Sequence, residues 1–444
     1  MLIMPKQETV ETPTNDKVKF YINNSGLIST KDSTGLSREY RPSPLESEGM
    51  IYGVKWDSVN DVMTPGIVLN GTFIASDYSN YPIQEKIGRG ILNKSTNTWT
   101  KLNKFNSSKL ENGSPATLDG SVGHVMVQIP RHYQLVTKSG NFVYILCSEF
   151  PFTFNSTPAW IPPAFLNKPH FYVGAFQGVA LTDSSTSKIG SVVLDTSSYS
   201  TQLYPNPYTN VSRANFRTRL PDGVGSGLHI QSYGMYEALY VLMLTEFKTW
   251  AIQEQLEGHT ERTGAWDYAW TQPVGLTLGM GDFSGSIWND SLNIYTGNSY
   301  RGIEHVFGNV WHVLDGINID NTAGGNQRVW ICYEPTHFAD DTTTNYIDTG
   351  FAPGWGEQIA VYIKNIYAAG KHIPLYPTEF GGAANASTFI TDAFWSSALG
   401  GGWRVLRVGG RANGSRRAGV GCRASADSSA YASSSVGVRL GGYI

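Results

Sequence analysis

The residues best suited to chemistry gather near the C-terminus, in the stretch from Leu399 to Ile444. Seven arginines and one acid, Asp427, lie between residues 401 and 444, although the whole 444-residue chain has a formal net charge of −3. Arginine makes paired hydrogen bonds to carboxylates, so we expect some of these side chains to make structural contacts to carboxylates or carbonyls. A single aromatic residue, Tyr431, lies within residues 411–435, and the overall pI is near 6.3, so the pattern does not favour nucleic-acid binding.

Two segments with alternating apolar residues flank this interior, at Trp403–Arg407 and Val436–Leu440. Such alternation predicts strands. Residues 411–435 between them are almost all small or polar, so they cannot bury themselves. We therefore predict a rigid support that presents a binding surface.

Other patterns give weaker indications of chemistry. His305 and His312 lie seven positions apart, without the carboxylate of an HExxH motif. Glu237 and Glu246 lie nine apart on a predicted helix and on roughly opposite faces, which argues against a catalytic carboxylate pair. The sequence has no GxSxG elbow and no phosphate-binding glycine pattern. We predict that the chain is not an enzyme and has no catalytic residues.

Acidic loop segments raise the question of a metal ion. Asp315 and Asp320, or Asp340 and Asp341, could hold a structural calcium ion, but their spacing is not that of an EF-hand, and solvated loop acids are the simpler interpretation. The three cysteines lie far apart without CxxC spacing, so neither a disulfide framework nor a zinc site is predicted. We expect no cofactor and no metal, with a structural calcium ion as the open alternative.

The composition is typical of a turn-rich β protein with polar loops. Charged residues are only 16% of the chain, whereas it contains 48 glycines and 24 tyrosines, a balance found on extracellular binding proteins and virion proteins. The sequence shows no secretory signal and no apolar window long enough to span a membrane. Export by the standard route is therefore not expected, and release in a phage particle by lysis would explain an extracellular role.

The pattern divides the chain into three parts. Residues 1–48 are polar and interrupted by prolines, which predicts an arm or virion-attachment linker with a short strand at residues 18–22. Residues 49–230 are predicted to form a β-rich elaboration. Residues 231–444 are predicted to form the core, with a ligand-presenting segment at residues 403–440.

The clearest helix is predicted over Tyr233–Leu256, with an aromatic and apolar stripe on one face, Ser232 as its N-cap and Gly258 after its end. Ile303–Leu314 is predicted as a short helix, and residues 356–370 as a strand or short helix. Strands are predicted at residues 50–56, 66–75, 124–136, 141–148, 170–181 and 328–334, with a hairpin around residues 138–140.

Two motifs, taken together and in this order, resemble the formylglycine-generating-enzyme branch of the C-type lectin fold. GNVW at residues 308–311 resembles that branch's GNVWEW motif. WRVLR at residues 403–407, followed by VGVRL at residues 436–440, resembles its ending WRVLRGGSW…GFR. Residues 50–57 and 124–133 look like landmarks of phage tail and receptor-binding proteins of this branch, which include retroelement-diversified ligand-binding proteins of the major tropism determinant type.

The resemblance implies an α+β fold: a C-type-lectin-like core with a twisted antiparallel sheet, two helices and long irregular loops, plus the β-rich elaboration. It implies that Trp311 and Trp403 are buried and that Asn309 bonds to the backbone. The frame residues that it implies are Gly308, Asn309, Trp311, Trp403, Arg407, Gly437 and Arg439. The last strand should lie in the sheet with Arg439 bonded to a carboxylate or to several carbonyls.

The function that the resemblance implies is host attachment by a bacteriophage virion protein of the tail fibre or tail tip, made in the host cytoplasm. Its partners would be a host-surface glycan or protein and other virion proteins, with a homotrimer as the expected assembly, no nucleic acid and no membrane insertion. Tyr431 and the arginines would supply anchors, and serines and Asn413 adaptable hydrogen bonds. The residues expected to face the ligand are Arg411, Asn413, Ser415, Arg416, Arg423, Ser425, Asp427, Ser428 and Tyr431.

Two alternatives stay open at this point. A formylglycine-generating-type enzyme would use a pair of cysteines near its last motif, whereas this region has Cys422 alone. A structural virion protein would instead bury the segment between subunits. Retroelement diversification is also open, because one sequence shows no variation.

Overall fold

The structure is a computed structural model. It describes residues 50–93, 95–182, 187–194, 206–221, 227–321, 327–352, 357–381, 390–397 and 401–444, together with the backbone of three strands nearer the N-terminus. The chain divides into two compact units, Met1–Met50 and Ile51–Ile444. In the first unit, β1 (Lys19–Ile22), β2 (Ile28–Lys31) and β3 (Ser37–Glu39) form an antiparallel sheet. The strand predicted at residues 18–22 is confirmed as β1, and the rest of the predicted arm, apart from β2 and β3, lies outside the described residues.

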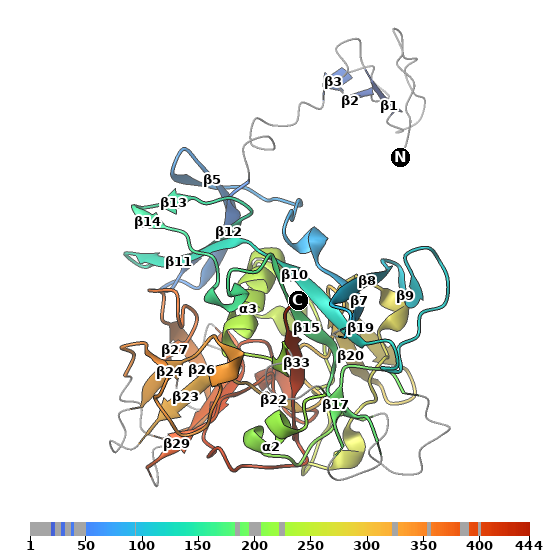
Figure 1. Cartoon of the computed structure of the whole chain (residues 1–444). Coiled ribbons are helices and arrows are strands. Elements are labelled where there is room, and N and C mark those ends of the chain that lie inside the picture. Colours follow the sequence, from blue (N-terminus) through green and yellow to red (C-terminus); the bar gives the residue numbers. More distant parts are fainter. Residues whose placement is uncertain are drawn as a thin grey trace. The chain divides into compact units, whose positions relative to one another are not determined.

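The second unit is mostly β, with several mainly antiparallel sheets and, in the part of the chain that the structure describes, two helices (Figure 1). The helices are α2 (Arg213–Thr218) and α3 (Tyr233–Phe247). The boundary predicted near residue 230 falls inside this unit, because strands from both sides of it pair in one sheet. None of the described helices is both long enough and apolar enough to cross a bilayer.

The first seven-stranded sheet joins the end of the chain to its earlier half. In spatial order its strands are β18 (Leu228–Ile230), β33 (Arg439–Gly442), β15 (His170–Gln177), β10 (His124–Pro130), β7 (Gly88–Asn93), β8 (Thr98–Asn103) and β9 (Asn106–Leu110). Both neighbours of β33 run antiparallel to it, so the last strand is interior to the sheet.

The second seven-stranded sheet contains the other C-terminal strands. Its order is β27 (Pro377–Phe380), β26 (Gln358–Ile366), β28 (Ile390–Ser396), β31 (Arg423–Ser425), β30 (Arg407–Val408), β22 (Trp311–Val313) and β32 (Val436–Gly437). The pairs β28–β31 and β22–β32 are parallel, and the other pairs are antiparallel. Residues 356–370, left open between strand and helix, contain strand β26.

Smaller sheets complete the unit. A five-stranded sheet has the order β11 (Tyr133–Ser139), β12 (Phe142–Ser148), β4 (Tyr52–Asp57), β5 (Val62–Leu69) and β6 (Thr72–Ala75). A four-stranded sheet contains β25 (Ile347–Asp348), β24 (Arg328–Ile331), β23 (Ile317–Asp320) and β29 (Trp403–Arg404), and a three-stranded sheet contains β19 (Gly285–Asn289), β20 (Ile294–Tyr300) and β21 (Ile303–Glu304). Two pairs remain: β13 (Thr153–Phe154) with β14 (Thr157–Pro158), and β16 (Val179–Ala180) with β17 (Ile189–Gly190).

Helix α3 is the interior helix of the second unit (Figure 1). The Ser232 side chain accepts a hydrogen bond from the backbone N–H of Met235, which confirms the predicted N-cap. The helix ends earlier than predicted, because Lys248 takes a left-handed conformation with φ of 59° and bonds back to the Leu244 carbonyl. The stripe packs in the core, but nearly all the other residues of the helix are buried too, so its predicted confinement to one face is wrong, and the helix is buried all round, as interior helices are.

Several predicted elements are wrong in their details. The predicted helix at Ile303–Leu314 is instead β21, a turn and β22, with the turn held by left-handed residues such as Asn309. The predicted strand at residues 124–136 is two strands in different sheets, β10 and β11, although the hairpin of β11 with β12 is confirmed. The predicted last strand at Val436–Leu440 is also two strands, because β32 joins one seven-stranded sheet and β33 the other.

Candidate functional site

The C-terminal stretch surrounds a concave pocket with a volume of about 390 Å³. We call it the C-terminal pocket. Its lining residues are Trp311, Trp395, Arg407, Gly410, Arg411, Asn413, Gly414, Arg417, Ala418, Cys422, Ala424, Ala426, Asp427 and Tyr431. The lining combines two tryptophans and several small residues with a larger share of polar surface, and the volume lies within the range usual for small-molecule sites.

The floor of the pocket is built by the second seven-stranded sheet. Trp311 lies on β22, Trp395 on β28 and Ala424 on β31. The two indole rings meet edge to face, with centroids 5.4 Å apart. Trp311 is 7% exposed, so its predicted burial is confirmed. Because the floor side chains come from strands of one sheet, the apolar surface is fixed before any ligand arrives.

Arg407, on β30, lies between the floor and the rim. Its guanidinium forms an ion pair with Asp427 and lies over two rings, 5.2 Å from the Trp311 centroid and 4.8 Å from the Tyr431 centroid. Only 9% of Arg407 is exposed, and its buried Nε has no hydrogen-bond partner among the described residues. Predicted as a frame residue, Arg407 therefore also belongs to the pocket.

The first rim loop runs from Gly410 to Ala418. Gly410 has φ of 74°, and a Cβ placed on it would lie 2.4 Å from the Cβ of Ala418, so only glycine allows the loop to close this tightly. The loop is tied to an upstream segment, where the Arg262 N–H donates to the Ala412 carbonyl over 2.8 Å. Asn413 of this loop donates through Nδ2 to a backbone carbonyl, and its buried Oδ1 has no partner in the part of the chain that the structure describes.

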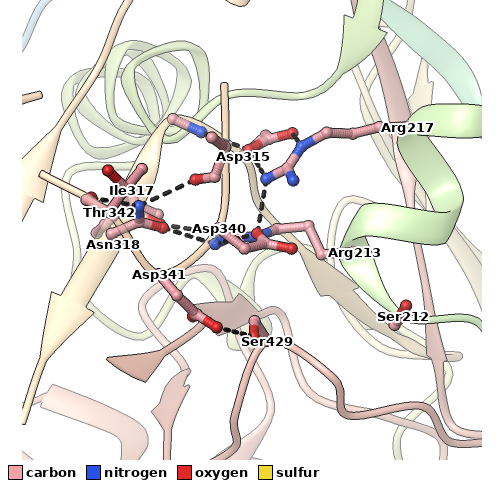
Figure 2. A network of polar contacts seen from close by, with 12 residues as sticks. Ser212, Arg213, Arg217, Asp315, Ile317, Asn318, Asp340, Asp341, Thr342 and Ser429 are labelled. Atoms are coloured by element: carbon pink, nitrogen blue, oxygen red, sulfur yellow. Dashed lines mark hydrogen bonds and ion pairs between the residues drawn. The ribbon is translucent and has the colours of Figure 1, made fainter. Parts of the chain in front are cut away.

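The second rim loop spans residues 426–431. The Val405 N–H donates to the carbonyl of Asp427 over 3.0 Å, and the Ser429 hydroxyl donates to Asp341 over 2.7 Å. Figure 2 shows this contact, in which Asp341 reaches the C-terminal stretch from an unrelated loop. Both rim loops are thus held by bonds to residues outside them, which gives the pocket a defined mouth.

Four of the nine predicted ligand residues line the C-terminal pocket: Arg411, Asn413, Asp427 and Tyr431. Ser415, Arg416 and Ser428 are exposed, as predicted, but lie outside its lining. Arg416 instead lines a smaller hollow of about 200 Å³ beside Glu254.

Two predicted ligand residues, Arg423 and Ser425, do not face outward. They lie on β31, which is inserted between β28 and β30, and they are 1% and 0% exposed. The Arg423 guanidinium contacts Glu237 of α3 over 2.5 Å. The prediction for these residues is wrong because a short strand, which the small-residue composition concealed, buries them.

The predicted frame residues are mostly where the sequence placed them. Asn309 donates to the Gln272 carbonyl and accepts from the Gln272 N–H, which confirms its bonding to the backbone. Arg439 is 2% exposed and donates to the carbonyls of Gly174, Glu304 and His305 over 2.6–2.9 Å, which confirms the predicted structural arginine. Gly308 and Gly437 are buried. Trp403 is only half-buried, so its predicted burial is wrong.

Two of the four acids considered for calcium, Asp315 and Asp340, are held by arginines. Arg217 of α2 contacts both Asp315 oxygens over 2.6 and 2.7 Å and reaches Asp340 over 2.8 Å, while Arg213 also contacts Asp340 (Figure 2). Burial would raise the pKa of Asp315, but Arg217 holds that pKa below its usual value. Guanidinium groups thus take the place considered for calcium, and within the described ranges no group of three His, Cys, Asp or Glu side chains could hold a metal.

The three cysteines, Cys147, Cys332 and Cys422, are free and buried. Cys422 lies directly behind the pocket wall, with 0% of its surface exposed. Burial raises the pKa of its thiol well above the usual value, so it stays a neutral apolar group.

Sequence reasoning missed the pocket residues outside the C-terminal stretch, above all Trp395, as well as Arg417 within it. No local pattern marks Trp395, because only the pairing of β28 with β31 brings it to the site. No protein-family model matches this chain, and the curated proteins that were searched give no match either. The arrangement can bind through shape, aromatic surface and positive charge.

Proposed function

We propose that this chain is a binding protein of a bacteriophage virion that attaches to a ligand on the host surface through the C-terminal pocket. The observation that carries the proposal is that residues far apart in the chain, from Trp311 to Tyr431, meet around one preformed concavity with an aromatic floor and a polar rim. The C-type-lectin-like fold, the tail location and the homotrimer rest on the sequence resemblance and are part of the proposal.

The state of Cys422 supports binding over an oxidation of the formylglycine-generating type. A nucleophilic or metal-binding cysteine works as an accessible thiolate. Here the thiol has no exposed surface, and burial raises its pKa. The pocket offers instead fixed arginines and rings, which suit recognition.

The test fills the pocket without disturbing its floor. Ala426 lines the pocket from the second rim loop, so Ala426→Trp places an indole in its mouth. Ala430→Trp is the matched control, because Ala430 is exposed in the same loop and lies outside the lining. Labelled protein is added to a panel of bacterial strains, and the strains that the wild type binds are then compared for both variants.

Adsorption should fall at least about tenfold for Ala426→Trp, since a blocked pocket loses its contacts, and should stay within about twofold for Ala430→Trp. Thermal unfolding of both variants checks that the fold survives. Unchanged adsorption of a folded Ala426→Trp variant, or a wild type that binds no strain, would show that the pocket is not a host-attachment site.

A further inference from the structure

The charges around the C-terminal pocket do not balance. Three arginines, Arg407, Arg411 and Arg417, line it, and the only lining acid, Asp427, already pairs with Arg407. Within the described ranges no carboxylate pairs with Arg411 or Arg417. Arg411 is half-buried, and its guanidinium lies 5.3 Å from the Trp266 ring and 3.4 Å from the Ser435 hydroxyl, both of them neutral groups. A concave site with uncompensated guanidinium groups favours an anionic ligand.

The neighbouring hollow has the opposite charge. It lies across the short η8 turn (Ser415–Arg417) and is lined by Glu254, Glu257 and Glu261. Arg416 points to that side and lies 3.9 Å from Glu254, whereas Arg417 lines the C-terminal pocket. An anion is therefore attracted to one side of η8 and repelled from the other, which confines it to the pocket.

Two buried polar atoms of the pocket residues have no partner among the described residues. Arg407 Nε is a donor, and Asn413 Oδ1 is an acceptor. Neither atom is exposed in this structure, so a ligand with several hydroxyls, each of which both donates and accepts, can bond them once the Arg407 and Asn413 side chains turn toward the pocket. Buried groups without partners are costly, so bonding them adds to affinity.

We infer that the ligand of the C-terminal pocket is an anionic saccharide, a pyranose unit that carries a carboxylate. The carboxylate would pair with Arg411 and Arg417, the hydroxyls would bond Arg407 Nε and Asn413 Oδ1, and the C–H face of the ring would pack on the Trp395 side of the floor. The pocket has the volume of a small-molecule site, which favours a sugar over a longer acidic peptide. This inference rests on the proposed function and names its ligand class.

The experiment compares acidic sugars with their neutral methyl esters, each of which lacks the charge and is larger by one methyl group. The full chain is titrated by calorimetry and saturation-transfer NMR with the methyl glycosides of glucuronic acid, galacturonic acid and N-acetylneuraminic acid, and with the methyl ester of each. At least one acid should bind about tenfold or more tightly than its ester, with affinity falling as salt rises. This comparison needs no variant, so it stands even if a substitution unfolds the protein.

Charge-matched variants then locate the site. Arg411→Gln combined with Arg417→Gln should weaken binding of the acidic glycoside about tenfold or more, since both guanidinium groups are lost. Arg131→Gln combined with Lys138→Gln changes the net charge equally on exposed residues outside the pocket and should keep the affinity within about twofold.

The inference is overturned if each acid and its ester bind with equal affinity, or if the two double variants bind the acidic glycoside equally well. It is also overturned if the protein binds an aspartate-rich peptide and none of the sugars. If the protein adsorbs to cells, loses that adsorption on Ala426→Trp, and yet binds none of the acidic glycosides, the assignment of an acidic sugar is wrong and the proposed function is retained. Adsorption that Ala426→Trp leaves unchanged would instead sink the proposed function.

Discussion

The arginines near the C-terminus are alike in sequence and differ in their surroundings. Arg439 is buried against three carbonyls, and Arg423 is buried against an acid. The Arg416 side chain is 81% exposed, and Arg411 lies at the pocket rim. Sequence alternation identified Arg439 as structural, because apolar neighbours flank it. Arg423 has small neighbours on both sides, so only the long-range pairing of its strand shows that it is buried.

Replacing Arg423 by alanine should lower the free energy of unfolding by roughly 3–5 kcal/mol, since Glu237 would remain buried without its partner. Arg416→Ala is the control and should change it by no more than about 0.5 kcal/mol, because that side chain is exposed. Urea unfolding measures both variants. Equal midpoints for the two would mean that β31 is not buried as described.

Asp392 should give the protein a pH-dependent stability. It is 0% exposed, and burial raises its pKa to about 7, against the lowering effects of the Gly421 N–H and Arg423. The folded state therefore holds a proton that the unfolded state has lost above about pH 4. This group's stabilising contribution is complete below that pH and is lost as the pH rises to about 7, by at most about 1.4 kcal/mol per unit.

Asp392→Asn removes this proton, so the difference in stability between wild type and variant should change between pH 4.5 and pH 8. The free energy of unfolding of the variant should rise relative to that of the wild type as the pH rises. Urea unfolding at several pH values measures this difference. The buried histidines are common to both proteins, so their contribution to the pH dependence of stability cancels in this difference. A constant difference across the range would contradict a titrating Asp392.

At the scale of elements, β33 is the strand on which the first seven-stranded sheet depends. Arg439→Lys should destabilise the protein by about 1–3 kcal/mol, because one ammonium group cannot reach three carbonyls in different directions. Arg328→Lys is the control, because Arg328 forms an exposed ion pair with Asp348. This substitution should leave the stability of the protein nearly unchanged. Differential scanning calorimetry compares the thermal unfolding midpoints of the two variants. Similar midpoints would show that the guanidinium group of Arg439 is not required to satisfy the three carbonyls.

Elements were predictable where the pattern was local and complete. The N-cap of α3 and the β11–β12 hairpin were found from Ser232 and from the turn before Asn141. Strand breaks were missed: Asn70–Gly71 turns the chain between β5 and β6, and residues after Pro130 move it to another sheet. A period-2 pattern does not tell which sheet a strand joins, because both sheets bury alternate side chains.

At the scale of the whole molecule, the two compact units should be separable. Deleting residues 1–48 should leave the thermal midpoint of the remaining chain unchanged, because Ile51–Ile444 has its own sheets and core. Under the proposed function, the shortened chain should fail to enter the particle. An insoluble product, or a midpoint lowered by several degrees, would show that the first unit contributes to the core of the second.

The pocket itself could be predicted only in part. Arg411, Asn413, Asp427 and Tyr431 came from one continuous segment of mostly small and polar residues, although part of that segment, β31, is buried. The floor came from β22 and β28, which no pattern connects to that segment. Long-range sheet pairing is set by the sum of many weak contacts, and one sequence without structure does not reveal it.

The way the rim is anchored decides where this chain can change its sequence over generations. Both rim loops touch the mouth of the pocket, yet β31 between them is locked by Arg423 and by the Gly421 bond to Asp392. Sequence changes should therefore accumulate in two separate segments, residues 411–417 and 426–431. The residues between them, which include β31, should hardly vary. A laboratory library confined to those two segments would produce new specificities on an unchanged scaffold. A library that also varied the residues between them would consist mostly of unfolded variants.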